Sequence, residues 1–343
     1  MAGKTNVSSS PVTLGDENML TLDKVFQASV VLKDIVRSTS IVSTAPISKV
    51  EATKGYGAEV CLVNGCYDDA YAKTLELKDE RGYTFVHPFD DEDVIAGQGT
   101  VGLEIVNEFA DCDAVIVPIG GGGLISGVAY AIKALKPSIK VYGVQAQSAP
   151  SMYNSVKHGG IECLKSVSTI ADGIAVKQPG EHTYELIKNY VDDIALVTDD
   201  EISSAILALI EKQKMIAEGA GAVSVAAAMF NKFPIAGKKV VSLVSGGNID
   251  VSILSRVIER GLMKSGRQTA LLIELIDKPG QLKDVSRIIA DLGGNVTSVH
   301  HERNGATSEV NGCYLRIDME TRNYDHVQEI TNALKKEGFK IVK

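Results

Sequence analysis

Four consecutive glycines are the part of this sequence with the clearest chemical meaning. They are Gly120, Gly121, Gly122 and Gly123. An apolar run at 114–117 with the character of a buried strand precedes them, and an apolar helix is expected from Leu124. Glycine lets successive backbone N–H groups turn toward one point without Cβ clashes, and a helix N-terminus adds partial positive charge. We therefore predict a phosphate-type anion site here, with a tight turn that binds nothing as the alternative.

The glycine run differs from the two common nucleotide-binding patterns. It lacks the spacing of G-x-G-x-x-G, and no Lys-Ser or Lys-Thr follows it as in a P-loop, so we expect no nucleoside triphosphate hydrolysis. A second candidate is Ser245, which ends an aliphatic run and precedes Gly246 and Gly247. Ligands of open α/β sheets bind at the carboxyl ends of strands, which favours a ligand contact for the Ser245 hydroxyl. A plain turn residue is the alternative.

The remaining reactive side chains form no recognisable centre. The six histidines show no metal-ligand spacing, and His300 and His301 are neighbours on an expected strand, so they point to opposite faces. The acidic run 90–93 is expected to be a solvated loop. The five cysteines include no C-x-x-C pair, which argues against a disulfide framework and favours the cytoplasm. We therefore predict no metal site.

Composition limits the partners. The 343 residues include 35 basic and 43 acidic side chains, and the net charge of −8 argues against a nucleic-acid partner. The longest stretch without charge, 114–132, contains Pro118 and the glycine run, which suit no membrane helix, so no membrane partner is expected. Residues 1–18 are polar and are expected to be a disordered tail, with Met19 as a native start. The length favours two domains.

Strands and helices are expected to alternate around the glycine run. Helices are expected at 22–37, 46–56, 68–81, 99–109, 124–135, 181–190, 200–216 and 219–230. Strands are expected at 59–63, 114–117, 140–145 and 238–244. This order predicts an α/β domain at 19–264 with a largely parallel sheet.

A second domain is expected at 268–343. Its strands are expected at 269–276, 296–302, 313–319 and 340–342, with one helix after the 277–282 turn and another at 326–337, capped by Asp325. The order βαββαβ is the ferredoxin-like arrangement. No strand is rich in aromatic residues on which bases could stack, so a small-molecule or interface role is favoured over RNA binding.

Longer strings carry a family resemblance. They are TAPISKVEATKGYGAEV (44–60), FVHPFDDEDVIAGQGTVGLEI (85–105), GGGGLISG (120–127), TIADGIAVK (169–177), AEGAGAVSVAA (217–227) and SGGNID (245–250). In this order they resemble a threonine dehydratase of the fold-type II pyridoxal-phosphate family. A D-x-P-G-x-L string resembles the ACT domain that follows in such enzymes; its residues are Asp277, Pro279, Gly280 and Leu282. The resemblance implies a tryptophan-synthase-β-like α/β fold with a truncated small domain, plus an α+β ferredoxin-like ACT domain.

The resemblance implies pyridoxal 5'-phosphate as the cofactor. Gly120 to Leu124 would hold its phosphate, and the Ser245 hydroxyl would hydrogen-bond the pyridine nitrogen, which suits β-elimination. Glu218 lies in the segment that would approach the ring, although a carboxylate at a helix N-terminus is the alternative. Asp172 and Gly173 would line the other side of the cofactor. The stretch 144–151, near which some family members hold a cation, offers no carboxylate, so no metal is expected there.

The catalytic lysine of the family is missing from the sequence. The family carries it in Ser-x-Lys-x-Arg-Gly and cradles the cofactor ring with a Ser/Ala-Gly-Asn-His loop; neither string occurs here. Several tens of residues that relatives carry near 40–43 are absent, so we assign no catalytic residue. That lysine bonds the cofactor and acts as a base, so its absence predicts weak or no lyase activity.

Two functions follow from the resemblance. The first is a threonine (and serine) ammonia-lyase that makes 2-oxobutanoate and ammonia, regulated at the ACT domain by an amino acid such as isoleucine or valine. The alternative is a catalytically inactive amino-acid-binding or oligomerising homologue that lacks the lysine segment. A homo-oligomer is expected in either case, because ACT domains pair by edge or helix contacts.

Overall fold

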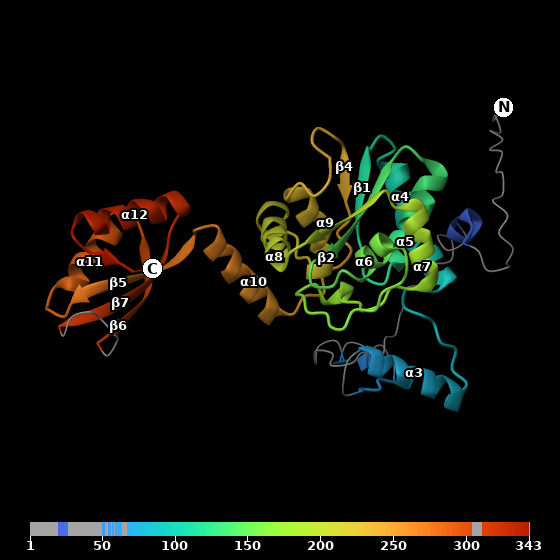
Figure 1. The fold of residues 1–343 in the computed structure, drawn as a ribbon, viewed down its shortest axis with the longest axis horizontal. Helices are drawn as coiled ribbons and strands as arrows, with labels where there is room; N and C mark the ends of the chain where they lie inside the picture. Colours follow the sequence, from blue (N-terminus) through green and yellow to red (C-terminus); the bar gives the residue numbers. More distant parts are fainter. Residues whose placement is uncertain are drawn as a thin grey trace. The chain divides into compact units, whose positions relative to one another are not determined.

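The computed structural model describes residues 20–26, 50–51, 54–55, 57, 59–63, 67–303 and 311–342. The chain divides into two compact units (Figure 1). The first comprises Met1–Asp199 and Ala220–Gly246, and the second comprises Asp200–Gly219 and Gly247–Lys343. The expected tail at 1–18 and the segment near 40–43 lie outside the described residues.

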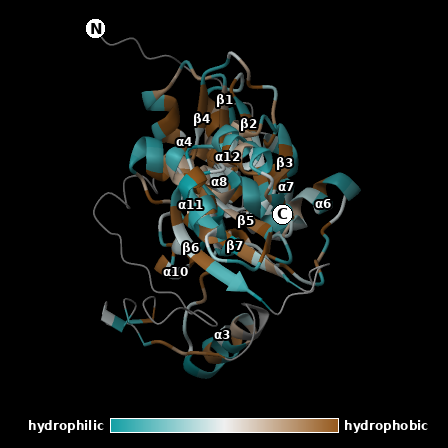
Figure 2. Ribbon diagram, turned by 90° about the vertical axis from the view of Figure 1, so that its left-hand side faces the viewer, coloured by the Kyte–Doolittle hydropathy of each residue, from teal (hydrophilic) through white to brown (hydrophobic). Residues whose placement is uncertain are grey.

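A parallel four-stranded sheet forms the centre of the first unit. The strand order is β3 (Asp193–Val197), β2 (Lys140–Ala146), β1 (Ala114–Pro118) and β4 (Val240–Ser242). All five residues of β1 are buried, and Figure 2 shows this strand as largely hydrophobic. A parallel strand that is covered on both faces requires such a continuous apolar run. The three strand pairs are all parallel, which confirms the expected parallel sheet.

Helices cover both faces of this sheet. Figure 1 shows α9 on one side and α4, α5 and α7 on the other. The bounds are α3 (Tyr67–Arg81), α4 (Glu92–Glu108), α5 (Gly123–Leu135), α6 (Ser151–His158), α7 (Glu181–Tyr190) and α9 (Gly219–Met229), with a short 3₁₀ turn η1 (Asp172–Ile174). The α5 helix follows β1 directly, so the glycine run lies at the carboxyl end of a central strand.

The second unit contains an antiparallel sheet with the order β6-β7-β5-β8. Its elements are α8 (Asp199–Ala208), a π turn η2 (Leu209–Gln213), α10 (Val251–Lys264), β5 (Gln268–Ile276), α11 (Gln281–Asp291), β6 (Asn295–Glu302), β7 (Gly312–Glu320), α12 (Tyr324–Lys336) and β8 (Lys340–Ile341). The α11 and α12 helices cover one face of the sheet (Figure 1). The βαββαβ order expected from the sequence is confirmed.

Contacts between α8 and α10 explain why the segment 200–219 belongs to the second unit. Asp200 on α8 accepts a hydrogen bond from Arg260 Nε at 2.7 Å and pairs with Lys264, both on α10. The side chain of Leu207 packs against Gly261, where an added Cβ would lie 2.7 Å from Leu207 Cδ2. The expected domain limits, 19–264 and 268–343, stay a prediction.

Several predicted elements are wrong. Residues 59–63 form no strand, and the helix expected at 200–216 ends as an α-helix at Ala208. The α4 helix begins at Glu92 instead of 99, because the Asp91 carboxylate accepts hydrogen bonds from the backbone N–H groups of the first turn. The acidic run at 90–93 is therefore the start of a helix rather than a solvated loop. The cap of α12 is Asn323, whose side chain accepts from His326 N, and not Asp325.

Three elements were missed altogether. They are α6, β3 and α10. Of the helix expected at 22–37, residues 22–26 are described and helical. Among the described residues, no helix is both long and apolar enough to cross a lipid bilayer.

Candidate functional site

The glycine run forms a buried turn between β1 and α5. The last sheet-like hydrogen bond runs from Ile119 N to Val144 O at 2.8 Å. Gly122 then takes φ +108°, a left-handed value that disfavours any side chain, and forms the N-cap of α5 without a side-chain hydrogen bond. Gly121, Gly122 and Gly123 are all buried.

Neighbouring segments leave no room for side chains in this turn. An added Cβ at Gly121 would lie 2.4 Å from the Phe89 ring, and one at Gly122 would lie 2.7 Å from Thr183 Cβ. At Gly123 the closest atom would be Phe89 O at 2.8 Å. The sequence analysis explained the glycines by the freedom they give successive N–H groups to turn toward one point. The structure adds a second reason, since Phe89 and Thr183 already fill the Cα side of the turn.

The carbonyl groups of the turn have protein partners. Gly121 O accepts from Thr183 Oγ1 at 2.7 Å and from Gly180 N at 3.3 Å. Gly122 O accepts from Ser126 N at 3.0 Å. The backbone of the turn is therefore fixed from its acceptor side by the start of α7 and the first turn of α5.

The N–H groups of the turn differ from its carbonyl groups in their hydrogen bonding. Within the described part of the chain, no carbonyl or side chain accepts a hydrogen bond from the N–H groups of Gly120 to Leu124. The first turn of α5 also carries no acidic side chain. Buried N–H groups nearly always have an acceptor, and a helix N-terminus favours a negative one. The turn therefore has the donors that an anion would need, and the predicted phosphate site stays a prediction.

Two of the other predicted residues lie close to this turn. An added Cβ at Gly120 would lie 3.2 Å from Ile174 Cα and 3.5 Å from Gly173 O, so η1 packs against the first glycine. Ser245 is exposed and follows β4, the parallel neighbour of β1. The two strands run in register through the bond from Leu243 N to Ile116 O at 3.0 Å. Ser245 and the glycine run therefore leave the sheet at the same edge.

The structure does not test the remaining predictions. Glu218 belongs to the second unit and is partly exposed, so its approach to the cofactor ring stays a prediction. Asp172 is exposed, and its Oδ1 accepts from Gly173 N at 3.0 Å. The segment near 40–43, where relatives carry the lysine, lies outside the described residues.

Residues 87–90 hold the turn in place, which sequence reasoning missed. His87 Nδ1 accepts from Asp90 N at 2.9 Å and from Phe89 N at 3.3 Å. The Asp90 carboxylate in turn accepts from Thr183 N at 3.0 Å and from Glu181 N at 2.9 Å, which caps α7. Burial lowers the pKa of His87, and the nearby carboxylates of Asp90 and Asp91 only partly oppose this. A neutral His87 is what an accepting Nδ1 requires.

The second unit holds a separate candidate site at the turn that joins β5 and α11. A cavity of about 420 Å³ is lined by this turn and by strand residues that include His301 and Arg303. The four predicted regulatory residues all line it: Asp277, Pro279, Gly280 and Leu282. Asp277 Oδ2 forms an ion pair with Arg303 Nε at 3.1 Å. Gly280, at φ +99°, forms the N-cap of α11 without a side-chain hydrogen bond.

Comparison with known proteins defines the class. Residues 36–246 match the family described as pyridoxal-phosphate dependent enzymes, and residues 269–339 match the ACT domain. The chain therefore belongs to the pyridoxal-phosphate dependent enzymes and carries a C-terminal ACT domain, as the resemblance in the sequence indicated.

The relatives narrow this class. The chain is 47% identical over 297 residues to an L-threonine ammonia-lyase of Thermotoga maritima, covering 87% of this chain and 74% of that one. It is 43% identical over 296 residues to an L-threonine ammonia-lyase of Geobacter sulfurreducens, with coverage of 86% and 74%. A solved structure of the processed threonine deaminase isoform 2 from Solanum lycopersicum is similar at TM-score 0.62 and 33% identity, covering 70% of this chain and 75% of that one.

The residues present fit the anionic end of the family cofactor. The N–H groups of Gly120 to Leu124, of which Gly121 to Gly123 are buried residues, have no acceptor among the described residues, and a phosphate would offer acceptors at this helix start. Ser245, at the same edge of the sheet, offers a neutral hydroxyl for the ring nitrogen. The turn therefore suits pyridoxal 5'-phosphate.

Proposed function

We propose that this protein is a threonine ammonia-lyase of weak activity, because the family's lysine segment is missing from the sequence, and that it also accepts serine and is regulated through its ACT domain. The observation that carries the proposal is the set of N–H groups at Gly120 to Leu124, buried at Gly121 to Gly123, without a protein acceptor in the described chain. The L-threonine ammonia-lyases named above support the choice of substrate.

Each part of the site has a defined task. The N–H groups of the turn and the α5 N-terminus bind the phosphate, and Thr183 and Asp90 keep the turn in its binding shape. Ser245 would hold the ring nitrogen through a neutral hydroxyl, and Gly173 would border the ring. When bound, the cofactor supplies the electron sink that lets threonine lose its Cα proton and β-hydroxyl. The protein positions and shields it.

The finer properties are part of the same proposal. The turn at Asp277, Pro279, Gly280 and Leu282 binds an amino-acid effector, isoleucine or valine, and the ACT unit pairs with a second copy to form a homo-oligomer. The four cysteines in the described part of the chain are unpaired, which supports a cytoplasmic location.

The test separates cofactor binding from turnover. The purified chain is dialysed against pyridoxal 5'-phosphate and, in parallel, against pyridoxal, which lacks the phosphate. We expect retention of the first at least tenfold above the second, with inorganic phosphate as a competitor. The loaded protein is then incubated with L-threonine, with and without isoleucine, and 2-oxobutanoate is measured.

The outcomes are distinct. Equal retention of the two compounds would overturn the phosphate site at the glycine turn. Selective retention without any 2-oxobutanoate would overturn the lyase activity and leave the cofactor site intact. Production of 2-oxobutanoate that isoleucine and valine leave unchanged would overturn only the effector assignment.

A further inference from the structure

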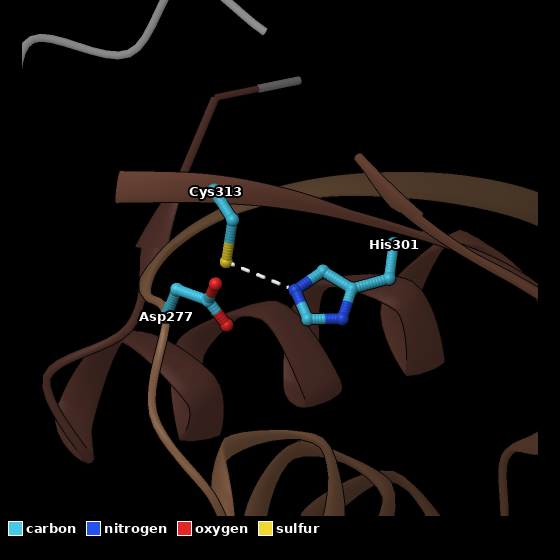
Figure 3. A group of neighbouring side chains, drawn as sticks. All are labelled: Asp277, His301 and Cys313. Atoms are coloured by element: carbon cyan, nitrogen blue, oxygen red, sulfur yellow. Dashed lines mark hydrogen bonds between the residues drawn. The ribbon is translucent and has the colours of Figure 1, made fainter. Parts of the chain in front are cut away.

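Three metal-ligating side chains converge in the second unit. They are Asp277, His301 and Cys313, and one ligand atom from each lies within 4.8 Å of the other two. Figure 3 shows the carboxylate and the imidazole directed toward the sulfur. His301 Nε2 lies 3.1 Å from Cys313 Sγ. Sequence spacing could not reveal this group, because its members are far apart in the chain.

The antiparallel sheet brings the three residues together. Asp277 directly follows β5, His301 is on β6 and Cys313 is on the central strand β7. Cys313 is paired with Leu275, and His301 is paired with Leu315. Directly paired residues project to the same face of a sheet, and Cys313 and Leu315 alternate by two along β7. All three side chains therefore meet at one end of the face that α11 and α12 cover.

The surroundings hold these groups in place. Cys313 is 1% exposed and packs in the core that α11 and α12 form on the sheet. Arg303 Nε forms an ion pair with Asp277 Oδ2 at 3.1 Å. A carboxylate has two oxygens, so this ion pair can orient Asp277 while leaving an oxygen for a metal, as outer-sphere partners commonly do.

We propose that Asp277, His301 and Cys313 form a binding site for Zn²⁺ or a similar borderline-soft divalent cation. Thiolate, imidazole and carboxylate are the ligand types of zinc, whereas Mg²⁺ and Ca²⁺ prefer oxygen alone. Tetrahedral zinc with bonds of about 2.0–2.3 Å requires ligand atoms about 3.3–3.8 Å apart. The His301 Nε2 to Cys313 Sγ distance of 3.1 Å lies just below that range and the other separations are at most 4.8 Å, so side-chain movements of about 1 Å suffice. On binding, Cys313 releases its thiol proton to solvent and coordinates as the thiolate.

Three protein ligands leave one coordination position free. All three residues line the cavity of about 420 Å³ at the β5–α11 turn, so water can reach the site and complete the tetrahedron. The site lies wholly within the second unit and does not depend on the cofactor or on the lyase activity. We therefore assign two kinds of ligand to the β5–α11 turn: the metal ion proposed here and the amino-acid effector proposed above.

The test uses the full chain, freed of cofactor and treated with a chelator. It is titrated with CoCl₂, because tetrahedral cobalt bound to a thiolate gives a sulfur-to-metal absorption band that other complexes lack. We expect one Co²⁺ per chain, displaced by ZnCl₂. His301→Gln and Cys313→Ser are each expected to lower the cobalt affinity at least tenfold, and Cys313→Ser also abolishes the sulfur band.

Two control variants match these changes. His300→Gln alters the neighbouring histidine, whose side chain is on the opposite face, and Cys163→Ser removes an exposed cysteine. Both are expected to bind cobalt as the wild type does. Because the Cys313 substitution could loosen the core, the exposed His301 variant decides the result independently. Absence of the sulfur band, or cobalt affinity unchanged by His301→Gln, would overturn the proposal.

Discussion

Two helices in this protein begin in the same way and have opposite surroundings. The α5 helix starts after Gly122 at φ +108°, and α11 starts after Gly280 at φ +99°; neither N-cap makes a side-chain hydrogen bond. An added Cβ at Gly122 would collide with Thr183, whereas one at Gly280 would meet no atom within 4 Å. The first start is enclosed by protein, and the second is open.

This difference shows that a helix N-terminus does not by itself define a ligand. At α5 the close packing fixes a row of main-chain donors, which suits a phosphate without any charged side chain. At α11 the space is open and charged side chains surround it, with Asp277 paired to Arg303. Recognition there depends on side chains. The same backbone conformation thus supports two different kinds of binding.

The largest expected effect contrasts the two glycines directly. Gly122→Ala adds strain at positive φ, about 1–2 kcal/mol, to an overlap with Thr183 that costs about 1–3 kcal/mol. Gly280→Ala carries only the strain. We expect urea unfolding to show a loss of about 2–5 kcal/mol for Gly122→Ala and about 1–2 kcal/mol for Gly280→Ala. Equal losses in the two variants would contradict the difference in packing.

The second prediction concerns the acceptor side of the glycine turn. Thr183→Val keeps the shape but removes the hydroxyl that donates to Gly121 O at 2.7 Å. We expect a loss of about 1–2 kcal/mol in stability and weaker retention of pyridoxal 5'-phosphate, because the turn is less firmly held. Thr183→Ser keeps the hydroxyl and serves as the control. Retention that is weakened as much in the serine variant would show that the hydrogen bond is not the cause.

Much of the fold followed from periodicity, and the failures have physical reasons. The buried run at β1 and the βαββαβ order of the second unit were strong signals. The start of α4 was missed because Asp91 acts as a cap, and an acidic run looks the same in a cap and in a loop. The strand β3 was missed although four of its five residues are apolar, because so short an apolar run is a weak signal for a strand.

The sites were predictable to different degrees. The glycine run and Ser245 could be selected from the sequence, because consecutive glycines and strand ends are local features. Phe89, Asp90 and Thr183 act on the turn from distant segments, so no local pattern marks them. The group at Asp277, His301 and Cys313 depends on strand register in the same way.

The third prediction tests the corrected cap of α12. The Asn323 side chain accepts from His326 N at 3.0 Å, so Asn323→Ala should cost about 1 kcal/mol. Asp325 lies in the first turn and contributes only through the helix dipole, so Asp325→Ala should cost a few tenths of that, about 0.3 kcal/mol. Urea unfolding of the second unit measures the loss of unfolding free energy in both variants. The reverse order of effects would restore Asp325 as the cap.

The smallest predicted effect is a pH dependence confined to the enclosed helix start. Burial lowers the pKa of His87 from its usual value near 6.5, because the folded state needs neutral Nδ1 to accept from Asp90 N. This contribution is complete above about pH 6.5 and is lost as the pH falls through the lowered pKa. It amounts to at most about 1 kcal/mol, since the ring is half-buried.

Comparing the wild type with His87→Gln isolates this histidine from all other titrating groups. The difference in unfolding free energy between the two proteins should be largest at pH 8 and should shrink toward pH 5. Retention of pyridoxal 5'-phosphate should fall over the same interval. His87 holds the backbone of Phe89 and Asp90, and Asp90 in turn holds Thr183 at the glycine turn. A difference that stays constant from pH 8 to pH 5 would mean that the turn does not depend on neutral His87, and the enclosed start would then rest on packing alone.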